Sequence, residues 1–166
     1  MNIETEYKFI IEKPDERILR GAENYTESRI VQIYLASQGT THRVRRREYA
    51  DGRVSYTENK KVRISKMSST EYEREITESE YAELSKNIEA GAAPLLKTRR
   101  TFYYAGKTLE LDYYDAWERT CIMEIELGSE DERVELPDFI RVIKDVTGER
   151  AYSNHSMAHS FPEEIV

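Results

Sequence analysis

The chain has 166 residues with a net charge of -7, and 39% of its residues are hydrophobic, which fits one folded domain. The acidic balance excludes a general nucleic-acid or anionic-membrane surface, because binding to phosphate groups requires net basic contact. The N-terminus is acidic and lacks a signal-peptide pattern, no apolar run is long enough for a membrane span, and the only cysteine is Cys121; together these features predict a cytoplasmic protein.

Hydrophobic and polar residues alternate with a period of two along much of the chain, which predicts strands with two different faces. In chain order we predict a strand at 3–11, a helix at 14–24, strands at 29–36, 41–49, 53–64 and 70–76, a helix that begins at the capping box Thr77–Glu80, strands at 97–105, 107–114 and 120–127, a helix from Pro137 to Thr147, and a short helix after Ser153.

Many strands joined by short turns favour an antiparallel sheet that closes on itself. Asp51-Gly52 is a hairpin-turn signal between two such strands, and no Pro/Gly-rich linker divides the chain. The expected fold is of the α+β class, an eight-stranded antiparallel β-barrel with a charged interior that is covered by a few helices. It forms a single domain over residues 1–166.

Charged residues share strand faces in a way that points to the inside of this barrel. Acidic and basic residues recur at every second position of six strands, and their neighbours on the opposite faces are largely apolar. The recurring sets are Glu4, Glu6 and Lys8; Arg43, Arg45 and Arg47; Glu71, Glu73 and Glu75; Lys97 and Arg99; Glu110 and Asp112; and Glu124 and Glu126. Burying so many unpaired ions is costly, so this pattern favours a solvated cavity that receives charged ligands.

Both kinds of charge suit one ligand class. Arg and Lys bind phosphate oxygens, and Glu-x-Glu pairs supply the hard oxygen ligands that Mg²⁺ and Mn²⁺ prefer. A cavity with both can hold a polyanion together with its metal ions, which is what phosphoryl transfer requires. The alternative for any single run of charges is the solvated face of an ordinary antiparallel sheet.

The sequence resembles the CYTH superfamily, the triphosphate tunnel metalloenzymes, along nearly its whole length. The resemblance rests on an ordered series of motifs: Glu4-Thr5-Glu6-Tyr7-Lys8, which matches E-x-E-x-K, then Gln32-Ile33-Tyr34-Leu35, Arg43-Val44-Arg45, Glu71-Tyr72-Glu73, Lys97-Thr98-Arg99, Leu109-Glu110-Leu111-Asp112, Glu124-Ile125-Glu126, Val146-Thr147 and Tyr152-Ser153-Asn154. It implies an eight-stranded tunnel that binds triphosphates with Mg²⁺ or Mn²⁺.

The resemblance also implies roles for individual residues. The metal ligands would be Glu4, Glu6, Glu73, Asp112, Glu124 and Glu126. The substrate-binding residues would be Lys8, Arg43, Arg45, Lys61, Lys97 and Arg99, and the residues expected to be catalytic are Lys8, Glu6 and Glu126. One position departs from the family pattern, because Asn59 stands where a lysine is usual on the fourth strand, and Lys61 follows on the same strand face.

The expected function is divalent-metal-dependent hydrolysis of a triphosphate, with inorganic tripolyphosphate as the substrate and diphosphate and phosphate as products. Three alternatives remain open at this point: an adenylate cyclase, a thiamine or nucleoside triphosphatase of the same fold, and a non-catalytic polyphosphate- or nucleotide-binding module. The expected partner is a small-molecule triphosphate, with no nucleic acid and no membrane. A homodimer is left open.

Three further residue types bear on function. His155 and His159 are four residues apart and could bind a metal from one helix face, but the sequence shows no third ligand, which favours a plain surface pair. Cys121 has no matching His and Asp residues for thiol catalysis. Trp117 is expected to pack in the core rather than to cover the tunnel mouth.

Overall fold

The computed structural model describes residues 2–166, so Met1, the first residue of the expected domain, lies outside the described residues. The strands are β1 (Asn2–Glu12), β2 (Thr26–Leu35), β3 (Thr41–Tyr49), β4 (Val54–Arg63), β5 (Ser68–Glu75), β6 (Leu95–Tyr104), β7 (Lys107–Tyr113), β8 (Thr120–Glu126) and β9 (Val142–Asp145). The helices are α1 (Glu16–Arg20), α2 (Glu78–Ser85), a 3₁₀ turn at Arg150–Tyr152, and α3 (Asn154–His159).

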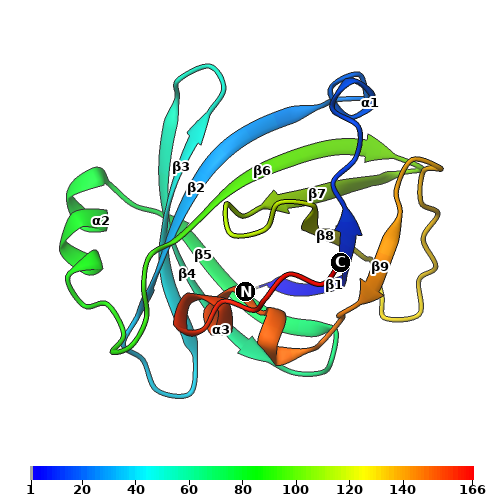
Figure 1. Cartoon of the computed structure of the whole chain (residues 1–166). Coiled ribbons are helices and arrows are strands. Elements are labelled where there is room, and N and C mark those ends of the chain that lie inside the picture. Colours follow the sequence, from blue (N-terminus) through cyan, green and yellow to red (C-terminus); the bar gives the residue numbers. More distant parts are fainter. Residues whose placement is uncertain (1) are drawn as a thin grey trace.

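Eight of these strands form a closed antiparallel barrel, as predicted (Figure 1). The strands are hydrogen-bonded in the order β5-β4-β3-β2-β6-β7-β8-β1, and β1 pairs again with β5 to close the ring. The first half of β1, from Asn2 to Thr5, pairs with β5, whereas its second half, from Glu6 to Glu12, pairs with β8. All these pairings are antiparallel, so side chains alternate regularly between the inside and the outside of the barrel.

The ninth strand corrects one of the sequence predictions. The segment 137–147, predicted as a helix from its apolar spacing, contains no helix; Val142–Asp145 instead forms β9 and pairs with Phe9, Ile10 and Ile11 of β1. This edge of β1 is available because β5 pairs only with the first half of the strand. Four apolar residues at helical spacing give only a weak local preference for a helix. Backbone hydrogen bonds to the edge of β1 therefore outweigh that preference.

The helices are short and begin at side-chain caps. Asp15 caps α1 by accepting from the backbone N–H groups of Arg17 and Ile18, and Gly21 ends the helix, so it is shorter than the predicted 14–24. The predicted capping box at Thr77 and Glu80 is present at the start of α2. No helix within residues 2–166 is long and apolar enough to cross a membrane.

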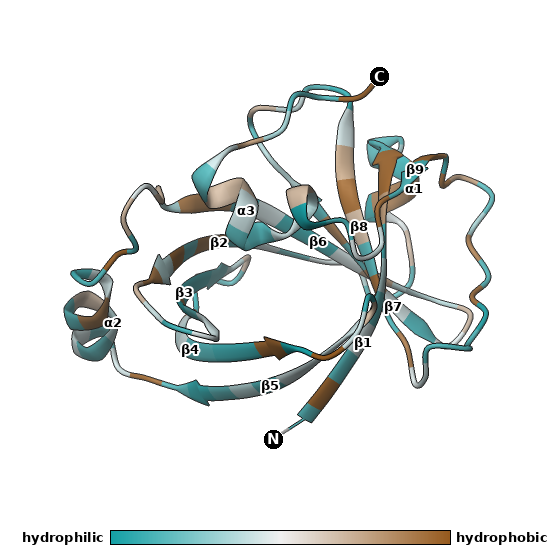
Figure 2. Cartoon of the chain, turned by 90° about the horizontal axis from the view of Figure 1, so that it is seen from below, coloured by the Kyte–Doolittle hydropathy of each residue, from teal (hydrophilic) through white to brown (hydrophobic). Residues whose placement is uncertain are grey.

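The outer face of the barrel packs against α1 and the extended chain that leads to β9. Leu19 of α1, Leu109, Leu111, Met123 and Ile125 form one buried cluster. Val134, Leu136, Phe139 and Ile140 of the chain before β9 pack against it. Figure 2 shows the hydrophobic colours along β8 and mostly hydrophilic colours along β4 and β5. The cover predicted to be helical is therefore largely a segment without regular secondary structure.

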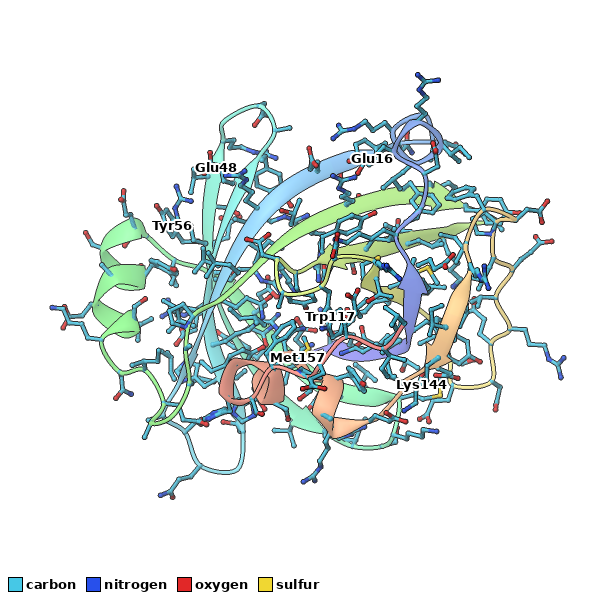
Figure 3. The ribbon with its side chains drawn as sticks, viewed as in Figure 1. Glu16, Glu48, Tyr56, Trp117, Lys144 and Met157 are labelled. Carbon is cyan, nitrogen blue, oxygen red and sulfur yellow. The ribbon has the colours of Figure 1, made fainter. Side chains whose placement is uncertain are left out.

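A second apolar cluster lies on the inward-facing side chains at one end of the barrel, beside α3. Its largest member, Trp117, is 2% exposed, stacks edge-on against Tyr114 and donates from Nε1 to the carbonyl of Pro162. Met157 of α3 belongs to the same cluster, and Figure 3 labels both side chains. The barrel interior thus has an apolar end, closed by α3 and the C-terminal segment, and a charged remainder. The expected packing role of Trp117 is confirmed.

Candidate active site

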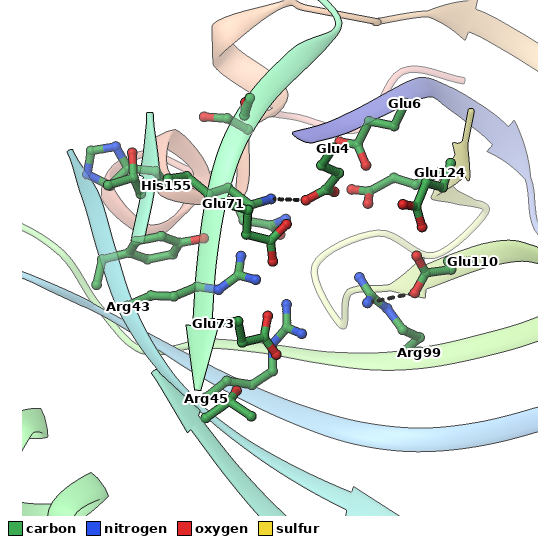
Figure 4. A pocket seen from close by; sticks show the side chains of 18 of the residues that line it. Glu4, Glu6, Arg43, Arg45, Glu71, Glu73, Arg99, Glu110, Glu124 and His155 are labelled. Carbon is green, nitrogen blue, oxygen red and sulfur yellow. Dashed lines mark ion pairs between the residues drawn. The ribbon is translucent and has the colours of Figure 1, made fainter. Parts of the chain in front are cut away.

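The charged part of the barrel interior is a cavity of about 1530 Å³. Most of the predicted site residues line it, namely Glu4, Glu6, Lys8, Arg43, Arg45, Lys61, Glu73, Arg99, Glu124 and Glu126. They come from β1, β3, β4, β5, β6 and β8, because the alternation of each strand sends every second side chain inward. Figure 4 shows the carboxylates of Glu4, Glu6 and Glu124 gathered on one side of the cavity, the guanidinium groups of Arg43 and Arg45 with Glu73 on the other, and Arg99 beside Glu110.

The cationic side of the cavity is built around Arg43 and Arg45, which lie near the carboxylate of Glu73. The Nε atoms of Arg43 and Arg45 are buried and have no hydrogen-bond partner among residues 2–166. Burial and the nearby charges of Arg43 and Arg99 lower the pKa of Arg45 to about 9. Arg45 is held in place by its Nη2, which donates to the side-chain oxygen of Gln32 at 2.8 Å. Positioned guanidinium groups whose Nε has no partner among the described residues are ready donors for an anion.

Arg99 is fixed from behind by a buried carboxylate. Asp112 is 1% exposed and accepts from Arg99 Nε at 2.8 Å, from Arg99 Nη2 at 2.9 Å and from Lys97 Nζ at 2.8 Å. Burial opposes ionisation, but the two cations outweigh it and hold the pKa of Asp112 well below its usual range. Lys97 and Asp112 are not among the residues of 2–166 that line the cavity. Together they form an ion cluster in the wall that orients Arg99.

The acidic side places like charges directly opposite one another. Glu6 is the register partner of Glu126 across β1 and β8, and Glu110 is the register partner of Glu124 across β7 and β8. Burial and the charge of Glu124 raise the pKa of Glu6 well above its usual value. Burial likewise raises the pKa of Glu110, against the opposing effect of Arg99. Cross-strand acid pairs are destabilising unless something neutralises them, so this arrangement favours a bound cation.

Lys8 joins two parts of the wall on the acidic side. Its Nζ lies 3.4 Å from Glu124 Oε1 and donates to the carbonyl of Tyr152 at 3.2 Å. Burial would lower the pKa of Lys8, but the charges of Glu124 and Glu6 outweigh it and raise the pKa. Lys8 therefore stays charged and ties β1 and β8 to the chain before α3.

The position that departs from the family pattern supports acids instead of contacting the cavity. Asn59 is 2% exposed, and its Nδ2 donates to Glu71 Oε1 at 2.6 Å and to Glu73 Oε2 at 3.0 Å. Lys61, two residues on, faces the cavity and pairs with Glu4 Oε2 at 3.0 Å. Burial and the neighbouring Glu4 raise the pKa of Glu71 to about 8. The fourth strand thus contributes the cavity cations Lys61 and Arg63 and one amide that holds two carboxylates.

These carboxylates fit a hard divalent metal ion. The acidic side offers oxygen donors only, the ligand type that Mg²⁺ and Mn²⁺ prefer, and its opposed acids carry negative charge that a dication would neutralise. The predicted residues Glu4, Glu6, Glu124 and Glu126 lie on this side. Glu73 lies beside Asn59 and Glu71 on β5, and Asp112 is already held by two cations.

Several cavity acids, among them Glu71 and Glu110, and the neutral residue Asn154 were absent from the predicted site. Glu71 and Glu110 line the cavity, and the strand alternation had placed them on the inward faces without assigning them a role. Asn154 accepts from Tyr114 OH at 2.7 Å and from Lys97 Nζ at 3.4 Å, which connects α3 to the buried ion cluster. The contact between Asn154 and Lys97 joins residues that are 57 positions apart, so no local sequence pattern predicts it.

The family model of the CYTH domain matches residues 2–161. Among solved structures, the inorganic triphosphatase NE1496 is 24% identical, with a TM-score of 0.59 over 95% of this chain and 99% of that chain. The PH1819 protein from Pyrococcus horikoshii OT3 is 18% identical, with a TM-score of 0.54 over 75% of this chain and 80% of the other. A conserved hypothetical protein from Pyrococcus furiosus is 21% identical, with a TM-score of 0.53 over 77% and 80% of the two chains. These structural likenesses show the shared fold, and no curated protein sequence matches significantly.

Proposed function

The chain belongs to the CYTH domain family, and on this basis we propose that it is a divalent-metal-dependent triphosphatase whose substrate is inorganic tripolyphosphate. The products would be diphosphate and phosphate. Both the name of one structural neighbour, an inorganic triphosphatase, and the charge arrangement of the cavity support this proposal.

The observation that carries the proposal is the convergence of many acidic and basic side chains on one cavity. The guanidinium groups of Arg43 and Arg45 are buried with unpaired Nε atoms among the described residues 2–166, and they lie across the cavity from Glu4, Glu6 and Glu124. Charges gathered at this density favour a charged ligand, because buried charge without a partner costs several kcal/mol. A polyanion with its metal ion would compensate both halves together.

The cations would bind and orient the substrate. Arg43, Arg45 and Arg99 would donate to phosphate oxygens through their planar forks, and Asp112 would keep Arg99 aimed at the cavity. Lys8, fixed between Glu124 and the carbonyl of Tyr152, would add a point charge at the border between the two halves. These groups would also stabilise the charge that develops on the transferring and leaving phosphates.

Glu4, Glu6, Glu124 and Glu126 would hold the metal, Mg²⁺ or Mn²⁺. When bound, the ion would neutralise phosphate charge and acidify the attacking water. Lys61 would hold the Glu4 carboxylate, and Asn59 would hold Glu71 and Glu73 in the adjoining wall. The substitution of lysine by asparagine at position 59 would then remove a phosphate contact without disturbing the acidic side.

A product-resolved assay tests the proposal and separates it from its rivals. Tripolyphosphate, ATP and thiamine triphosphate are incubated with the protein and either Mg²⁺ or Mn²⁺ at neutral and alkaline pH. The proposal predicts release of phosphate from tripolyphosphate. Cyclic AMP formed from ATP would indicate a cyclase, and binding of tripolyphosphate without turnover under all conditions would refute the hydrolase assignment.

Two matched variants locate the activity in the cavity. Glu6→Gln keeps the shape of the side chain but removes a proposed metal ligand, so turnover is expected to fall by at least about 100-fold. Glu83→Gln makes the same chemical change on the exposed surface of α2, where Glu83 pairs only with Lys86 among its described neighbours, and should leave turnover unchanged. Equal activity of both variants would contradict the proposed metal site.

A further inference from the structure

Outside the acidic and cationic halves of the cavity, the structure brings together two histidines and a glutamate. Glu89 Oε1 lies 3.0 Å from His155 Nε2 and 2.5 Å from His159 Nε2. One ligand atom from each residue can be chosen such that all three lie within 4.8 Å of one another. The two imidazole rings meet edge to face, with centroids 5.2 Å apart.

Two separate elements build this cluster. His155 and His159 are four residues apart on α3 and therefore share one face of the helix. Glu89 lies in the segment that follows α2, and its position is fixed by backbone hydrogen bonds on both sides. Its own N–H donates to the carbonyl of Tyr34 at 2.9 Å, and the N–H of Ala93 donates to the carbonyl of Ala158 at 2.9 Å. The third ligand, which the sequence did not reveal, is thus Glu89, a residue 66 positions before His155.

The backbone leaves room for His159 beside this segment. Gly91 has a φ of +82°, and a Cβ atom at this position would lie 3.4 Å from His159 Nδ1. A side chain here would be strained in the left-handed region and would crowd the imidazole. Glycine at position 91 thus allows the segment to pass close to the ring while Nε2 points toward Glu89.

The cluster is open to solvent and has suitable charge. The side chains are 38% exposed for His155, 31% for His159 and 27% for Glu89, so an ion can reach them from water. Burial opposes ionisation of Glu89, but the hydrogen bonds with the two imidazoles together outweigh it and lower the pKa of the carboxyl. Two imidazole nitrogens converge on an ionised carboxylate oxygen from a second chain segment.

We propose that Glu89, His155 and His159 form a binding site for Zn²⁺, distinct from the all-oxygen metal site proposed in the cavity. Imidazole nitrogen and carboxylate oxygen are typical zinc ligands, and three protein ligands leave one tetrahedral position for water. Mg²⁺ prefers oxygen ligands only and is not selected by two imidazoles. The two sites therefore differ in ligand type, and the same protein would bind two different metals.

The position of the site indicates what a bound zinc ion would do. His155 stacks on Tyr34 with ring centroids 5.1 Å apart, and the residue before it, Asn154, binds Tyr114 and Lys97 at the inner wall. His155 also lines the cavity, and Figure 4 shows it at the margin. Zinc would fasten α3 to the segment after α2 and so hold the helix that closes the apolar end of the barrel.

Zinc binding to the metal-stripped, full-length protein tests the proposal by competition with a chromogenic chelator at about pH 7.5, where free imidazoles are mostly neutral. Under the proposed function the cavity carboxylates would also take up divalent ions, so each variant is measured in the Glu6→Gln background as well. We expect one zinc ion whose affinity falls by at least about 100-fold in His155→Ala/His159→Ala, because even the loss of a supporting contact costs about 10- to 100-fold. His42→Ala, which removes the remaining histidine of the chain, should leave that affinity unchanged.

Two further readouts guard against an effect of folding. Glu89→Gln keeps the side-chain shape and should weaken zinc binding while the far-ultraviolet circular dichroism stays that of the wild type. Zinc should raise the thermal midpoint of the wild type and of His42→Ala but not that of Glu89→Gln. Two results would overturn the proposal. One is a zinc affinity equal to that of the wild type in both the folded Glu89→Gln protein and the double histidine variant. The other is a zinc-induced rise in the thermal midpoint of Glu89→Gln equal to that of the wild type.

Discussion

The substitution Asp112→Asn separates two roles for this residue, that of a metal ligand and that of a buried counterion. The sequence resemblance assigns Asp112 to the metal site, whereas the structure surrounds it with the guanidinium of Arg99 and the ammonium of Lys97. The substitution keeps the size of the side chain and removes its charge. It therefore leaves two cations, whose side chains are 0% and 8% exposed, without their shared anion.

The size of the effect follows from these contacts. Three charge-assisted hydrogen bonds converge on Asp112, and each contributes about 1.5–3 kcal/mol when its partner is charged. The amide oxygen of asparagine still accepts hydrogen bonds and so retains part of this energy. The loss of unfolding free energy should therefore approach the value for removing one member of a buried ion pair, about 3–5 kcal/mol. For a domain of this size that corresponds to a fall of roughly 6–20 °C in the thermal midpoint.

Urea unfolding of the metal-free protein at neutral pH measures this loss directly. Glu110→Gln is the matched control, because Glu110 pairs with the same Arg99 but is 31% exposed. Burial raises the pKa of Glu110, so neutralising it should cost less than about 1 kcal/mol. A loss below about 1 kcal/mol for Asp112→Asn, together with a lower affinity for Mg²⁺, would refute the counterion role and support a metal ligand.

Three further predictions concern single residues. Arg45→Gln removes a buried cation that is disfavoured in the ligand-free protein. The thermal midpoint should therefore stay the same or rise, while calorimetry should show at least about a tenfold loss of tripolyphosphate affinity. Lower stability with unchanged affinity would contradict this. Burial raises the pKa of Glu58, but hydrogen bonds from His42 and Arg74, both at 2.6 Å, outweigh it and lower the pKa below the unfolded value. Glu58 therefore stabilises the fold above about pH 4.5, and this contribution is lost as the pH falls through the folded pKa. The difference in unfolding free energy between the wild type and Glu58→Gln should shrink between about pH 7 and pH 3. A constant difference would count against this role of Glu58. Cys121 is fully buried, and burial together with the charge of Asp112 raises its pKa, so a thiol reagent should label it only on unfolding; rapid labelling of the native protein would be inconsistent with the structure.

The strands could be predicted because their signal is local. Alternation along segments such as 41–49 and 107–114 reflects one wet, charged face and one apolar face, and the observed strands agree within a few residues. The same alternation correctly turned Lys61 toward the cavity, where it meets Glu4. Since the period of two fixes the side of each residue, most of the candidate site followed from strand parity.

What failed or was missed depends on contacts between distant segments. The helix predicted at 137–147 was wrong, because Val142–Asp145 pairs with an edge of β1 that only the folded barrel leaves available. The pairing of Asp112 with Lys97 and Arg99 requires the register of β6 against β7, which alternation alone does not give. Glu89 completes the histidine pair only because the segment after α2 runs beside α3.

A phosphorus NMR time course of tripolyphosphate with the wild-type protein tests the central claim most directly. With Mg²⁺ or Mn²⁺ removed by a chelator, the resonances of the substrate should persist unchanged. On addition of either metal, they should be replaced by those of diphosphate and phosphate. Tripolyphosphate that binds but stays intact with both metals, or hydrolysis that continues at full rate in the chelator, would contradict the account.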